Sequence, residues 1–119
     1  MEYNIGDSVR FDVSFDYQGP YYTGAKLKCA VGIKGVFFDE KCKTEISLIL
    51  PETMAWDRFT QRVLVTLKGV KMGEVYDTEV RLMPNIWGQP ALEWDGAQNI
   101  QMGALAPDFE FRNLTVRVG

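Results

Sequence analysis

The sequence predicts an all-β protein, a single-domain antiparallel β-sandwich of about seven to nine strands. The first observation is compositional: Val, Ile and Thr number 24 of the 119 residues, and Phe, Tyr and Trp add 7, 5 and 3. These residue types suit a pleated, half-buried sheet surface. The second observation is that apolar and polar residues alternate along several segments, as they do in strands with one buried face. The third is the lack of any amphipathic helical stretch long enough to connect parallel strands.

Five segments alternate clearly and are expected to be strands. In the first, Val9–Asp16, every second residue is apolar, from Val9 to Phe15, and the residues between are charged or Ser14. The others are Ala25–Ile33, Thr44–Leu50, Phe59–Leu67 and Tyr76–Leu82. The inward positions expected in these four are Leu27, Cys29, Val31, Ile33, Ile46, Leu48, Leu50, Phe59, Val63, Val65, Leu67, Tyr76, Val80 and Leu82. Turn-forming pairs, Asp95-Gly96 among them, are expected to end strands.

Three segments are less regular. Glu52–Arg58 is the one stretch that would suit a helical turn, although it is short for a helix. Pro84–Pro107 is irregular, with short strands expected around Ala91–Trp94 and Gln98–Met102. In the last strand the apolar residues change parity: Phe109 and Phe111 are followed by Leu114, Val116 and Val118. A β-bulge near Arg112–Asn113 would place all five on one face. The alternative is a strand with two partly buried faces.

Length and charge exclude several function classes. The chain is expected to form one domain over residues 1–119 and to bury roughly 65% of its unfolded surface. Histidine is absent, which removes most catalytic triads and His-ligated metal sites. A net charge of −3 and a pI near 4.9 argue against a nucleic-acid partner. No apolar run approaches about 18 residues, so no membrane insertion is expected. No signal peptide is visible.

The two cysteines, Cys29 and Cys42, leave two alternatives open. A turn around Phe37–Phe38 would place Cys29 opposite a residue near Ser47, and no disulfide could form. A tighter turn around Lys34–Phe37 would bring the two cysteines opposite each other. A buried small residue and a separate edge thiol are the favoured interpretation.

Acidic residues occur in pairs, which are Asp39/Glu40, Asp77/Glu79, Glu93/Asp95 and Asp108/Glu110. Asp77 and Glu79 have a spacing that would suit a glycosidase, but both are expected on the solvent face of a strand. The loop pairs would suit calcium, yet no EF-hand-like spacing accompanies them. We therefore assign no catalytic residue, no metal ligand and no cofactor, and expect no enzyme.

Aromatic residues outside the alternating core are the best candidates for contact with a ligand or partner. They are Tyr21, Tyr22, Trp87 and Trp94, all in expected loops or at strand ends. Trp56 is instead expected to close one end of the sandwich. Asn113-Leu114-Thr115 matches the glycosylation sequon but falls within an expected strand, so no glycan is expected.

The sequence resembles two kinds of β-sandwich module. The first is the immunoglobulin-like module of the CARDB and fibronectin-like kind, over roughly residues 5–83. The residues that carry this resemblance are Ile5-Gly6-Asp7-Ser8-Val9, Trp56 leading into Phe59–Leu67, and Val75–Leu82 after a glycine turn. Trp56-Asp57-Arg58-Phe59 and the closing Phe109–Val116 resemble jelly-roll carbohydrate-binding modules, in which the last strand returns beside the first. Neither resemblance implies a catalytic residue. The second implies a sugar site, to which Trp87 and Trp94 correspond loosely.

These observations favour a non-catalytic structural or interaction module that recognises a protein partner, or a second copy, through loops and strand edges. The loops are Gln18–Thr23, Val36–Glu40 and Pro84–Pro107. Part of an extracellular, cell-surface or virus-particle assembly is the expected setting. The alternative is a carbohydrate-binding module that uses loop tryptophans as stacking platforms.

Overall fold

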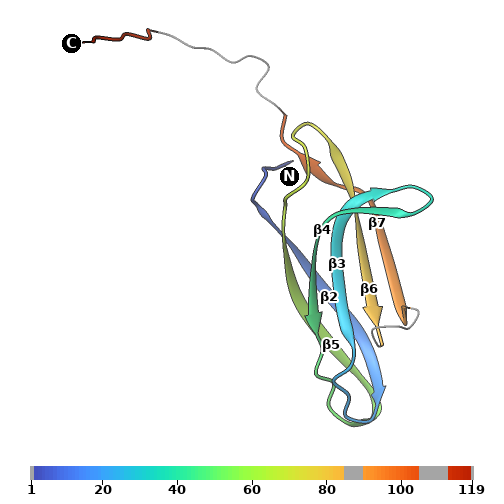
Figure 1. Cartoon of the computed structure of the whole chain (residues 1–119). Coiled ribbons are helices and arrows are strands. Elements are labelled where there is room, and N and C mark those ends of the chain that lie inside the picture. The colour runs from blue at the N-terminus through green and yellow to red at the C-terminus, as the bar shows by residue number, and fades with distance from the viewer. Residues whose placement is uncertain (1, 85–89, 105–112, 119) are drawn as a thin grey trace.

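The computed structural model describes residues 2–84, 90–104 and 113–118 (Figure 1). Within these residues the chain is all-β, as predicted, and contains no helix. Its strands are β1 (Glu2–Tyr3), β2 (Ser8–Gly19), β3 (Lys26–Lys34), β4 (Phe38–Ser47), β5 (Thr53–Thr66), β6 (Val75–Met83) and β7 (Leu92–Met102). Among the described residues there is no helix long and apolar enough to cross a membrane.

The strands form two sheets. One has the order β1-β7-β6-β3-β4, and the other consists of β2 and β5. All pairings are antiparallel except that of β1 with β7, which is parallel. The β2–β5 ribbon joins residues distant in sequence, from Ser8 opposite Thr66 to Gly19 opposite Thr53.

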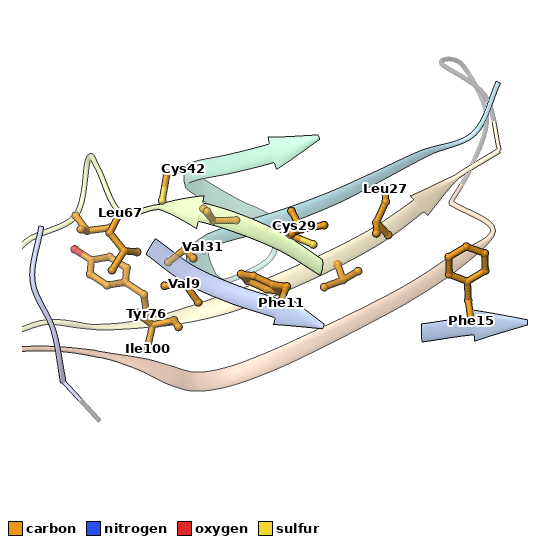
Figure 2. Close-up of a cluster of buried hydrophobic side chains, with 14 of the residues drawn as sticks. Val9, Phe11, Phe15, Leu27, Cys29, Val31, Cys42, Leu67, Tyr76 and Ile100 are labelled. Atoms are coloured by element: carbon orange, nitrogen blue, oxygen red, sulfur yellow. The ribbon is translucent and has the colours of Figure 1, made fainter. Parts of the chain in front are cut away.

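The core lies between the two sheets, as Figure 2 shows. The alternating inward positions of β2, β3 and β5 supply most of it, and Leu27, Val65 and Leu67 are fully buried. Tyr76 and Ile100 face each other across β6 and β7 and extend the core along the larger sheet. The period of two in the sequence therefore predicts the buried face correctly in these strands. Ile33 is the exception, because it lies near the tip of the β3–β4 hairpin and is 46% exposed.

Several expected boundaries are wrong. Glu52–Arg58 holds no helical turn, because β5 begins at Thr53 and continues its ladder with β2 as far as Gly19. The strand expected at Thr44–Leu50 begins at Phe38 and ends at Ser47. Asp95-Gly96 does not end a strand, because β7 runs through it and joins both short strands expected there.

The C-terminal segment Asn113–Val118 forms no strand, contrary to expectation. Leu114, Val116 and Val118 are 90%, 77% and 91% exposed, so these three residues share no buried face. Figure 1 shows the segment, in red, projecting away from both sheets, and no strand lies beside it there to pair with its backbone. Phe109, Phe111 and Arg112 lie outside the described residues, and so does most of the expected bulge. The sequon Asn113–Thr115 is consequently exposed and not in a strand.

Cys29 and Cys42 are both buried and both free. Cys29 lies opposite Thr44, and Cys42 lies opposite Val31, so neither expected register is observed. The ladder shifts between Val31 and Gly32, which displaces Cys42 from Cys29 along the hairpin. Burial raises the pKa of the Cys29 thiol to about 11, which makes it a poor nucleophile at neutral pH.

Candidate interaction groove

The two sheets are joined along one side only. On that side β5 lies against β4 and β3, and the hydroxyl of Thr44 donates a hydrogen bond of 2.8 Å to the carbonyl oxygen of Leu64. On the other side β2 and β7 each keep one edge unpaired along most of their length, within the described residues. Only the last two residues of β7 have a partner there, in β1. The fold is therefore open between β2 and β7.

A groove occupies this opening. Its larger part has a volume of about 460 Å³ and is lined by Val9, Phe11 and Val13 of β2 and by Trp94 and Ile100 of β7. Tyr3 of β1 lines it as well. A smaller hollow of about 220 Å³ continues from it, because the two share Val13, Ser14, Val80 and Trp94. We call the two together the β2–β7 groove.

The walls of the groove are apolar but incompletely covered. Leu92 and Trp94 pair with Leu82 and Val80 of β6, so they belong to the face of the sheet that carries the core. Yet Leu92 is 54% and Trp94 53% exposed, since β2 does not reach over them. Side chains on the inner face of a sandwich are normally covered by the opposite sheet. The groove therefore has the character of a core with one strand missing.

A polar pair forms part of the same wall. The side-chain amide of Asn99 donates a 2.7 Å hydrogen bond to the hydroxyl of Thr78, which is almost fully buried. Gly96 leaves room for this bond, because a Cβ atom there would lie 2.5 Å from both bonded side-chain atoms. These two residues satisfy each other within the protein.

The path of β7 depends on an irregularity opposite Asp77. Tyr76 pairs with Ile100 and Thr78 with Gly96, so an extra stretch of β7 bulges out beside Asp77. The Asp77 carboxylate accepts hydrogen bonds from the backbone N–H of Gln98 at 2.7 Å and of Lys34 at 2.8 Å. Gln98 has a φ of 52°, a conformation that only a turn or bulge requires of a residue other than glycine. Asp77 thus fixes the backbone of the bulge that separates Trp94 from Ile100 along β7.

The outer face of the larger sheet carries a network of charges. Glu79 is buried, contrary to the expectation that it faces solvent, because β6 lies in the middle of the sheet. Its carboxylate lies 3.0 Å from a guanidinium nitrogen of Arg81 and 3.6 Å from the ammonium of Lys28, whose side chains cover it. Arg81 also contacts Asp95 at 3.2 Å, and Lys34 contacts Asp95 at 2.6 Å. The described residues contain no group of acidic or cysteine side chains that would hold a metal ion.

Asp95 should make the fold sensitive to acid. The hydrogen bond from Lys34 lowers the pKa of Asp95 below its ordinary value of 3.8, partial burial opposes the shift, and Arg81 adds to it. Because the folded pKa is lowered, the stability that ionised Asp95 contributes is present above the ordinary pKa and lost as the pH falls through the folded one. We expect Asp95→Asn to be less stable than the unaltered protein at neutral pH, and this difference to shrink as the pH falls below the ordinary pKa of Asp95. Urea unfolding at several pH values measures this. The matched substitution at exposed Asp57 should show a smaller difference, and a constant gap between Asp95→Asn and the unaltered protein at all pH values would contradict the assignment.

The four residues singled out from the sequence lie in different settings. Trp94 lines the groove. Tyr21 lies in the β2–β3 connection and is 63% exposed. Tyr22 is half-buried: its backbone pairs with Leu50, and its hydroxyl donates a hydrogen bond to the carbonyl oxygen of Pro84. Trp87 lies outside the described residues.

Other residues of the candidate surface carry no distinctive signal in the sequence. Val9, Phe11 and Val13 alternate as ordinary core residues do, and nothing in the pattern shows that one side of β2 is open. Trp56 is 70% exposed on β5, so its expected role in closing the sandwich is wrong. Val36 and Phe37 are 96% and 86% exposed at the β3–β4 tip, within a loop expected to take part in recognition. Comparison of the chain with family models, with curated proteins and with solved structures finds no match.

Proposed function

We propose that the protein is a non-catalytic interaction module whose partner adds a β-strand in the β2–β7 groove. The observation that carries this proposal is the apolar groove flanked by two unpaired strand edges. Unpaired edges offer rows of N–H and C=O groups that pair readily with another chain. Peptides that bind in this way obtain affinity from the backbone and specificity from alternate side chains that enter pockets.

The chemistry of the groove supports association with a protein. Val13, Leu92 and Trp94 offer apolar surface that a partner would remove from water, at about 25 cal/mol per Å². A half-exposed tryptophan at the centre of such a surface is typical of an interface anchor. We take the fold to be a sandwich of the immunoglobulin-like or jelly-roll type, serving as a building block of an assembly on a cell surface or virus particle.

A lysine in the groove tests this proposal. Trp94→Lys places a charge against the apolar wall and should weaken self-association at least roughly tenfold, because an unpaired charge cannot be buried cheaply. Trp56→Lys is the matched control, since Trp56 is exposed on β5 and does not line the groove. Sedimentation velocity over a wide concentration range measures the association. If the two variants weaken association equally, the proposal is wrong. It is also wrong if the unaltered protein is monomeric at every concentration and no protein partner binds it.

Carbohydrate binding is the second candidate function, and the setting of Trp94 is what favours it. The exposed indole lies in a groove that Arg10, Asp12 and Asn99 also line, which combines a stacking surface with hydrogen-bonding groups. Titration with a panel of soluble polysaccharides should then change the tryptophan fluorescence of the unaltered protein. Trp94→Ala should abolish the change, and an unchanged response in that variant would exclude this site.

A further inference from the structure

We propose that the strand that fills the β2–β7 groove is the C-terminal segment Asn113–Val118 of a second copy of the chain. This inference rests on the proposed function and names the partner. The segment is an apolar stretch without a sheet, and the groove is an apolar surface without a covering strand. The two do not contact each other within one copy of the chain. The segment has three exposed apolar side chains, and the groove has the half-exposed Leu92 and Trp94.

The C-terminal segment has the pattern of a strand without a sheet. Leu114, Val116 and Val118 alternate with Thr115 and Arg117, and the three apolar side chains are all at least three-quarters exposed. Val and Thr favour extended backbone and pack well against neighbouring strands. Paired on one face, the segment would bury Leu114, Val116 and Val118 together.

The spacing of the segment matches the wall of the groove. Its three apolar residues repeat every second position, as do Val9, Phe11 and Val13 on β2. Both sets span about 13 Å, at roughly 3.3 Å per residue. A strand between β2 and β7 would also cover Leu92 and Trp94, the half-exposed residues on the opposite wall.

The charge of the segment suits the rim of the groove. Arg117 is its one charged residue, and it would point outward with Thr115. The outward carboxylates of the flanking strands already pair with arginine or lysine side chains, so the added strand would meet a rim of balanced charge. These carboxylates are Asp12 and Asp16 on β2 and Glu93 and Asp95 on β7.

A second copy fits the groove better than the chain's own C-terminal segment. The chain leaves β7 at Gly103, whose N–H donates a 2.8 Å hydrogen bond to the carbonyl oxygen of Tyr3. Tyr3 also lines the groove, so β1 occupies the end of the groove nearest to the point of departure. Asn113–Val118 lies beyond this end and projects away from the body (Figure 1).

A charge on the inward face of Asn113–Val118 tests whether this segment is the strand that enters the groove. We expect Val116→Asp to raise the dissociation constant for self-association at least roughly tenfold, because the carboxylate would enter an apolar groove. Thr115→Asp introduces the same charge one residue away, on the outward face, and should change the constant less than about threefold. Circular dichroism should show unchanged folding in both variants, since the segment projects away from the body. Equal effects of the two substitutions would overturn the proposal.

Engineered cysteines decide which copy supplies the strand. Ser14 lines the groove on β2. On the added strand, Thr115 would lie beside Ser14 in one strand direction. Arg117 would lie beside Ser14 if the strand runs in the other direction. Ser14→Cys in one tagged copy is mixed with Thr115→Cys or Arg117→Cys in another copy of different mass. The native thiols compete poorly because both are buried. A disulfide between the two copies supports the proposal. A chain carrying both substitutions that forms its disulfide internally as a monomer would overturn it, as would the lack of any disulfide in either arrangement.

The two proposals can fail separately. If Trp94→Lys weakens association and Val116→Asp does not, the groove is the interface and another segment fills it. If neither substitution has an effect on a protein that does associate, the interface lies elsewhere and both proposals are wrong. A contact in which each copy donates a strand to the next is heterologous, so the assembly either closes into a ring or pair or grows as a filament. Mass photometry distinguishes these forms.

Discussion

Replacing Gly32 with alanine is expected to destabilise the fold by about 3 kcal/mol, at the upper end for overpacking by a small group. Gly32 lies where the β3–β4 ladder shifts register, and the two strands approach closely there. An added Cβ would overlap the carbonyl oxygen of Asp39 and lie 2.9 Å from a ring carbon of Phe38. The oxygen belongs to the backbone of a paired strand, so it cannot rotate out of the way. Urea unfolding followed by circular dichroism measures the loss.

Gly35→Ala is the matched control for this prediction. The same methyl group at position 35 would meet nothing closer than the carbonyl oxygen of Phe37, at 3.8 Å, which is ordinary contact. We expect a change in stability within about 0.5 kcal/mol. If Gly35→Ala is as harmful as Gly32→Ala, the cause lies in the flexibility of the hairpin and not in the close approach of β4.

Leu27→Ala is expected to cost about 2–5 kcal/mol, the range measured for removing large aliphatic side chains from protein cores. Leu27 is fully buried on β3 (Figure 2). It pairs with Leu82 on β6 and with Ile46 on β4. It also lines the smaller hollow of the β2–β7 groove, so its removal would join a new cavity to that hollow. The surrounding strands cannot close such a space without breaking their ladders.

The control for this substitution is Leu64→Ala. Leu64 lies on β5 and is 53% exposed, so truncating it removes little buried surface. A cost below about 1 kcal/mol is expected, measured in the same unfolding experiment. Similar costs at the two positions would contradict the placement of the core.

The sequence predicts strands well wherever the two faces of a strand have different surroundings. Buried or half-buried residues alternate with exposed ones along β2, and this alternation places the start of the strand to within one residue. The first half of β5 lacks this contrast, because Met54 and Trp56 are 90% and 70% exposed and their polar neighbours are exposed too. Hydrophobic period carries no information in such a segment. The sequence therefore does not show that β5 begins at Thr53, and the prediction of a helical turn at Glu52–Arg58 is wrong.

The C-terminal segment shows that alternation can also occur where the structure has no strand. Leu114, Val116 and Val118 alternate correctly for a strand, yet the structure places them in no sheet. Alternation indicates that a segment suits a strand with one buried face. It does not indicate which sheet, or which molecule, would cover that face. The candidate site was open to the same ambiguity. Residue type alone singles out Trp94, whereas Val9, Phe11 and Val13 belong to the core, and the sequence does not show that their strand has an open edge.

The long-range pairing of β2 has a consequence for synthesis. β3 and β4 are joined by a short turn and can meet soon after both leave the ribosome, but Ser14 on β2 waits for Thr60, 46 residues later in the chain. Pairings at such separation form slowly because a long loop must close first. During this interval β2 exposes both of its edges and the whole apolar face from Val9 to Phe15. Neighbouring nascent chains would then compete with β5 for β2, so the yield of correctly folded protein should fall as the rate of synthesis rises.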